Sequence, residues 1–111
     1  MKLDSTKEYR YGEQIRPGDE DQVADIIKGR CMVLRTSALC AVHLRPKPER
    51  HMLIGDDIYV SGALAGGKPG KHIVPKGFAA RWQELPNDHS LFKLPEHWEH
   101  RERARRSSFS V

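Results

Sequence analysis

Long apolar runs are missing from this sequence. None of its 111 residues lies in an uninterrupted apolar stretch of the roughly 18 residues that a membrane-spanning helix needs. The segment 1–14 is polar and holds no apolar stretch of the kind found in a signal peptide. The two cysteines, in a chain with no secretion signal, favour free thiols over the alternative of a disulfide. These absences predict a cytoplasmic protein with one modest core and no membrane partner.

Motifs for catalysis and for metal binding are missing as well. The sequence has no Gly-x-Ser-x-Gly nucleophile elbow. Zinc ligands usually come in close pairs, and Cys31, Cys40, His43 and His51 are spaced too irregularly for that. Both cysteines stand within apolar segments, which favours buried free thiols. We therefore predict no catalytic residues, no metal and no cofactor, although a small hydrolase whose site is assembled only by the fold stays open.

Basic charge is concentrated in the middle of the chain. The formal net charge is +4, and residues 31–93 carry nine Lys and Arg against five Asp and Glu. Most of this excess lies in two acid-poor clusters, a proline-stiffened rim (Arg45, Lys47, Arg50) and a glycine-rich loop (Lys68, Lys71, Lys76). Positive surfaces of this kind attract polyanions such as nucleic acid. The six cations are therefore our predicted nucleic-acid-binding residues.

The glycine-rich loop follows the spacing of a phosphate-binding loop from Gly62 to Lys68. The next position should carry a hydroxyl for magnesium, but it is Pro69, which also prevents the helix that would complete an anion site. A nucleotide site is therefore not predicted. A flexible loop that carries lysines can still follow a phosphate backbone. The alternative is a solvated loop that lysines keep soluble.

An amphipathic helix is predicted over residues 19–28. Asp19 and Gln22 have the spacing of a capping box, and Val23, Ile26 and Ile27 form an apolar stripe with helical spacing. Gly29 then supplies a stop signal.

Strands are predicted through most of the remaining chain, at 9–11, 31–34, 39–44, 52–54, 58–60 and 72–74, with irregular structure over 62–71. A short helix is expected at 78–85, before Pro86. Together these elements predict an α+β fold in which one helix packs on a small antiparallel sheet or open barrel. Residues 1–94 would form this single domain, and residues 95–111 a C-terminal helical extension and tail.

The C-terminal helix is expected to begin near Pro95, which suits a first helical turn. It carries glutamates four residues before basic side chains, the favourable order for pairing along a helix. Its one bulky apolar residue is Trp98. Such a helix either stays solvated or docks on a protein partner, and Trp98, Arg101 and Arg105 are the predicted docking residues.

The sequence thus favours a non-enzymatic basic module that binds nucleic acid or a nucleoprotein complex. The alternative is an interaction or assembly subunit that docks through its C-terminal helix, as a host-modulating factor of a phage or mobile element would. Steep salt dependence of binding would distinguish the first function from the second.

Overall fold

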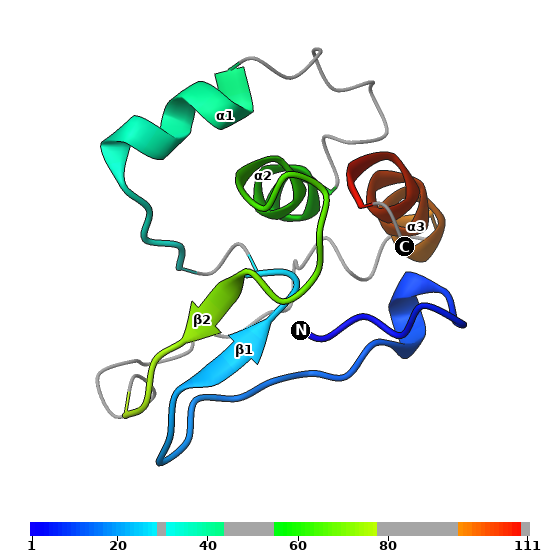
Figure 1. The fold of residues 1–111 in the computed structure, drawn as a ribbon. Coiled ribbons are helices and arrows are strands. Elements are labelled where there is room, and N and C mark those ends of the chain that lie inside the picture. Colours follow the sequence, from blue (N-terminus) through cyan, green and yellow to red (C-terminus); the bar gives the residue numbers. More distant parts are fainter. Residues whose placement is uncertain (29–30, 44–54, 78–95, 110–111) are drawn as a thin grey trace.

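The computed structural model of the chain describes residues 1–28, 31–43, 55–77 and 96–109. It is an α+β fold in which a two-stranded antiparallel sheet lies beside two central helices (Figure 1). In chain order the elements are the 3-10 turn η1 (Tyr9–Tyr11), β1 (Gln22–Ala24), the 3-10 turn η2 (Thr36–Ala38), α1 (Leu39–His43), α2 (Asp56–Leu64), β2 (His72–Val74) and α3 (His97–Ser108). Among these described residues, no helix is both long and apolar enough to cross a bilayer.

The helix predicted over residues 19–28 is wrong, because the centre of this segment is strand β1. β1 pairs antiparallel with β2, and Val23 lies opposite Ile73 in the register. A capping box contributes only about 1 kcal/mol, a local preference that tertiary pairing readily overrides. The strand leaves Val23 52% exposed but directs Ile26, just after it, into the core. The predicted strand at residues 72–74 is confirmed as β2.

The strand predicted at residues 58–60 is also wrong, because these residues belong to helix α2. Asp56 and Asp57 occupy its first turn, where the helix dipole favours negative charge. The helix ends in a Schellman motif, in which Gly67 N–H donates to the Gly62 carbonyl (2.8 Å) and Gly66 N–H to that of Ala63 (3.3 Å). Gly66 takes the left-handed conformation that this motif requires, with φ +63°. The first glycines of the expected irregular loop therefore belong to a helix and its end.

Other expected strands also differ in the structure. Residues 39–43 form helix α1, residues 9–11 form η1, and residues 31–35 are neither helix nor paired strand. Cys31 and Cys40 are free thiols as expected, but both are exposed rather than buried. The strand at 52–54, the helix at 78–85 and the domain boundary at residue 94 fall outside the described residues, so they stay predictions.

Helix α3 confirms the predicted C-terminal helix, but it is part of the core and not a solvated extension. It packs against α2 and η1, with Ala104 fully buried between them. The core cluster has few bulky members: Met1, Tyr9, Ile26, Ile58, Ala104 and Phe109. Small side chains let the two helices approach closely. The helix therefore docks within its own chain, without needing a large apolar stripe.

Gly62 of α2 lies so close to Ser108 of α3 that we expect an added methyl group at this position to destabilise the fold. A Cβ atom there would lie 2.5 Å from the carbonyl oxygen of Ser108, which is backbone and cannot move aside cheaply. We expect Gly62→Ala to lower the free energy of unfolding by about 1–3 kcal/mol, despite the better helix propensity of alanine. The measurement is denaturant unfolding. Gly18→Ala, where the new atom meets nothing closer than 3.7 Å, is the control and should change stability by less than about 0.5 kcal/mol.

Candidate functional site

An exposed basic feature of the described fold is the turn that joins α2 to β2. We call residues 68–71, Lys-Pro-Gly-Lys, the lysine turn. Gly70 adopts φ +73° and donates its N–H to Asp25 Oδ1 at 2.5 Å. Lys68 and Lys71 flank this anchor, and both side chains are exposed. The backbone of the turn is thus tied to the body of the protein while its two cations face solvent.

Asp25 is the residue that fixes the turn. Its carboxylate is buried, and its second oxygen accepts the N–H of Leu3 at 2.5 Å. Hydrogen bonds between a carboxylate and backbone N–H groups are charge-assisted and stronger than neutral ones. One side chain after β1 therefore joins the N-terminal segment, the sheet and the lysine turn.

The backbone N–H groups that a phosphate-binding loop would offer are occupied here by acceptors from the chain itself. Gly66 and Gly67 donate into the end of α2, Lys68 N–H donates to the Ala65 carbonyl at 3.3 Å, and Gly70 donates to Asp25. A nucleotide phosphate would have to compete with all of them. The glycine spacing thus reflects a helix end and a tight turn, and the lysine side chains are what the loop presents.

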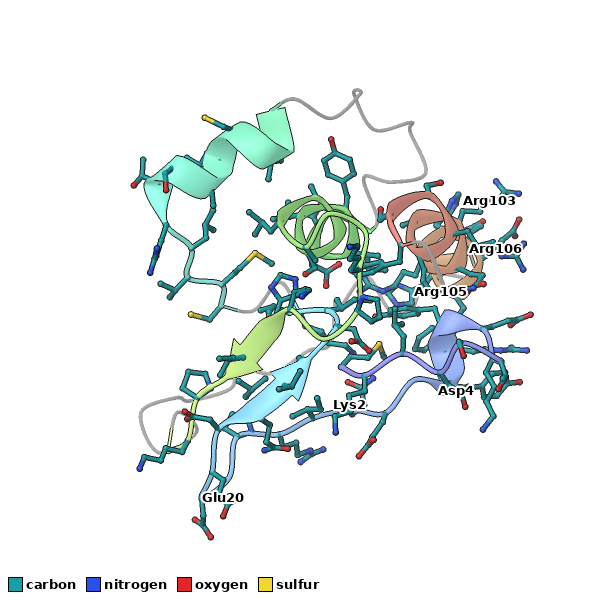
Figure 2. The ribbon with its side chains drawn as sticks, in the orientation of Figure 1. Lys2, Asp4, Glu20, Arg103, Arg105 and Arg106 are labelled. Atoms are coloured by element: carbon teal, nitrogen blue, oxygen red, sulfur yellow. The ribbon has the colours of Figure 1, made fainter. Side chains whose placement is uncertain are left out.

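Lys76 lies in a different electrostatic setting, at the other end of β2. Its side chain is exposed, but its N–H donates to Asp21 Oδ1 at 2.9 Å. Asp19 and Glu20 are also exposed, and Glu20 stands at the tip of the loop that enters β1 (Figure 2). These acids offset the charge of Lys76. Of the three predicted loop cations, Lys68 and Lys71 are therefore the better pair for an anionic ligand.

Arg45, Lys47 and Arg50 of the predicted rim fall outside the described residues. Whether the rim and the lysine turn form one cationic face stays a prediction. Within the described ranges, neither Lys68 nor Lys71 forms an ion pair. Their charge is thus available to a ligand.

The three predicted docking residues of α3 lie in unlike surroundings. Trp98 is 42% exposed and meets the ring of His97 edge-on, with 4.8 Å between centroids. Arg101 and Arg105 are instead buried. Figure 2 shows Arg105 on the side of α3 that faces the N-terminal segment. Only the tryptophan of the three presents much surface to a partner.

Arg101 is the centre of a buried polar cluster that also contains Tyr9 and Asp57. Its guanidinium donates to Asp57 Oδ2 at 3.0 Å and to the Tyr9 hydroxyl at 2.7 Å, and it lies 4.8 Å from the centre of the Tyr9 ring. Burial alone would lower the pKa of Arg101, but the hydrogen bond and charge of Asp57 raise it. The cluster joins η1, α2 and α3, so its chemistry is that of an internal clamp.

Glu102 forms a second clamp on the same helix. It accepts the N–H of Tyr9 at 2.6 Å, both bonds of a forked interaction with Arg105 (2.5 and 2.9 Å), and Arg106 Nε at 3.0 Å. Burial alone would raise the pKa of Glu102, but the hydrogen bonds from Arg105 and from the Tyr9 backbone lower it to about 2. The acid-to-base spacing in the sequence predicted the Glu102–Arg106 pair, but the sequence analysis missed the buried partners of both clamps. The available signal was the spacing of His97, Arg101, Ala104, Arg105 and Ser108, which places them on one helix face.

Metal ligands are not grouped in the described part of the chain, where no three His, Cys, Asp or Glu side chains are placed to hold an ion. Since His51 and His89 lie outside it, the absence of a metal stays a prediction. Comparisons with protein-family models, with curated proteins and with solved structures give no match to this chain.

Proposed function

We propose that this protein is a cytoplasmic, non-enzymatic module that binds nucleic acid or a nucleoprotein complex through the lysine turn. The observation that carries the proposal is the pair Lys68 and Lys71, two exposed cations without a described ion-pair partner on a turn whose backbone is anchored to Asp25. Anchoring lowers the entropic cost of presenting both charges together. Phosphate contacts of this kind position a ligand and carry no sequence information. The expected binding is therefore sequence-tolerant and dependent on salt.

A simpler role for these lysines is local stabilisation, since cations near a helix C-terminus interact favourably with its dipole. That interaction is worth about 0.3–1 kcal/mol at an exposed site. It predicts a small loss of stability on neutralisation and no change in affinity for any polyanion. The affinity for a polyanion after neutralisation therefore distinguishes the two roles.

Neutralising the lysine turn is the direct test. We expect Lys68→Gln with Lys71→Gln to weaken binding of mixed-sequence RNA and DNA oligonucleotides alike. If both lysines contact phosphates, the slope of log affinity against log salt should fall by about one for each lysine. Fluorescence anisotropy titrations at several salt concentrations give both values, and thermal unfolding shows that the variant stays folded.

A matched control removes two cations that already have partners. Arg10 pairs with Glu8 at 3.2 Å, and Arg103 pairs with Glu99 at 2.7 Å. Arg10→Gln with Arg103→Gln makes the same change in net charge and should leave the salt slope nearly unchanged. Equal losses in both double variants would show that net charge, not the lysine turn, attracts the polyanion. Absence of binding by the unmodified protein at low salt would overturn the proposal.

Trp98 supports a second candidate function, docking on a protein partner through α3. A tryptophan 42% exposed on a helix is the kind of side chain that anchors protein interfaces. Docking through such an apolar anchor would depend little on salt, whereas polyanion binding falls steeply with it. Capture of a partner that persists at high salt and is lost on Trp98→Ala would favour this alternative.

A further inference from the structure

Residues 31–35, Cys-Met-Val-Leu-Arg, lie between β1 and η2 and belong to no helix or paired strand. Side-chain exposure alternates along it: Cys31, Val33 and Arg35 are exposed, whereas Met32 and Leu34 are half-buried. Val33 is 90% exposed, the highest value among the large apolar side chains of the described residues. Alternation with a period of two is typical of a β-strand. The segment therefore has the side-chain pattern of a strand, with one face on the protein and one in solvent.

Among the described residues, this segment has no strand partner. In the described structure, the backbone of residues 31–34 takes part in no hydrogen bond. The first interaction is at Arg35, whose carbonyl accepts Ala38 N–H at 2.9 Å as η2 begins. Unpaired strand-like backbone is a template for pairing with another chain. Natural edges are commonly protected by proline or by inward-pointing charges, and residues 31–34 contain neither.

We infer that this segment pairs antiparallel with the same segment of a second copy, with Val33 opposite Val33. This register sets Met32 of one copy against Leu34 of the other, so that apolar side chains face each other on the half-buried side. Arg35 then lies opposite Cys31 and not opposite a second arginine. Directly opposed like charges destabilise a strand pair, and the parallel in-register arrangement would create one at Arg35. The charge pattern thus selects the antiparallel, two-fold symmetric pairing.

The dimer is expected to be weak. Five residues per strand make a short ladder, and two-stranded ladders are marginal in water without further packing. Leu39, which is 52% exposed at the start of α1, extends the exposed apolar surface beyond η2. An interface of this size belongs with small transient contacts. We expect a dissociation constant on the order of 0.1 mM.

Cysteine crosslinking tests the register directly. In a background of Cys31→Ser and Cys40→Ser, the substitution Val33→Cys would place two thiols opposite each other across the two-fold axis. Opposed residues of an antiparallel pair have Cα atoms about 4.5–5.5 Å apart, within the range that a disulfide bridges. We expect a covalent dimer under mild oxidation at about 0.1 mM protein. Ser37→Cys in the same background places a thiol at another exposed position outside the ladder and should crosslink far less.

Sedimentation equilibrium without any added nucleic acid provides the second measurement. The unmodified protein should show reversible dimerisation, and Val33→Lys should weaken it at least tenfold, because two positive charges would then face each other. Since Val33 contacts so little of its own chain, the melting temperature of dilute Val33→Lys should not change. Equal crosslinking of the Val33→Cys and Ser37→Cys variants, or a protein that stays monomeric at about 1 mM, would overturn the inference. Neither outcome bears on the lysine turn.

Discussion

Replacing Arg101 with methionine is expected to lower the free energy of unfolding by about 3–5 kcal/mol. The substitution keeps most of the side-chain volume but leaves the buried Asp57 carboxylate and the Tyr9 hydroxyl without their shared guanidinium donor. Removing one member of a buried ion pair costs more than the pair itself contributes, because the remaining charge is poorly solvated. Urea unfolding followed by tryptophan fluorescence would measure the change. A loss of this size is a large fraction of the stability of a small domain.

The control for this experiment lies one half-turn away on the same helix. Arg103 pairs with Glu99 at 2.7 Å, but both side chains are more than half exposed. Such a pair contributes at most about 1 kcal/mol, so Arg103→Met should have a small effect. The double variant Asp57→Asn with Arg101→Met should lose less than the sum of the two single losses, because neither buried charge then remains. Equal effects of Arg101→Met and Arg103→Met would contradict the clamp.

The same contrast shows why formal charge along the sequence is a poor guide to where unpaired charge reaches solvent in this protein. Four arginines on α3 look equivalent in the sequence, yet Arg101 and Arg105 are inside and Arg103 and Arg106 are outside. The two buried arginines are paired with Asp57 and Glu102. Exposed positive charge without an ion-pair partner is therefore found on the lysine turn more than on α3. This distribution is what directs the proposed function to Lys68 and Lys71.

Local signals predicted the C-terminal helix α3 and strand β2, but not the other helices and strands that the structure describes. Helix α3 was predictable because Pro95 and the acid-to-base spacing act within a few residues. Strand β1 was not predictable, because its partner β2 lies about fifty residues away in the sequence. The local capping-box pattern in the same segment pointed instead to a helix. Helix α2 was mistaken for a strand because Ile58 and Val60 are β-branched. Its acidic first turn and Gly66 stop were present in the sequence and outweigh that preference in the structure.

The candidate site also has one part that local sequence signals predicted and another part that they did not. Lys68 and Lys71 could be identified because a glycine-rich, acid-free segment is visible in the sequence and is exposed in the structure. Their anchor, Asp25, could not be, because it acts across 45 residues. The Arg101 cluster was missed because only bulky apolar residues were counted as core-forming on α3. Small residues and paired arginines fill that face instead.

Lowering the pH is expected to remove the contribution of Glu102 to stability. Its pKa is about 2 in the folded protein, against an ordinary value of 4.5. Because the folded pKa is the lower one, the stabilisation is fully present above about pH 4.5 and is lost as the pH falls toward 2. The shift corresponds to about 3 kcal/mol at neutral pH, and the side chain is only 13% exposed, so little of this is screened by solvent. The interaction holds η1 onto α3.

The variant Glu102→Gln isolates this effect from the titration of other carboxyl groups. At pH 7 it should unfold about 3 kcal/mol more easily than the unmodified protein, and this difference should shrink steadily between pH 4.5 and 2. Glu99→Gln, at an exposed glutamate that pairs only with exposed Arg103 among the described residues, serves as the control and should give two nearly parallel stability curves. Denaturant unfolding at five or so pH values supplies both curves. If the Glu102→Gln difference were constant down to pH 2, the carboxylate would stabilise the fold by its shape and neutral hydrogen bonds, and its charge pairing with Arg105 would contribute nothing.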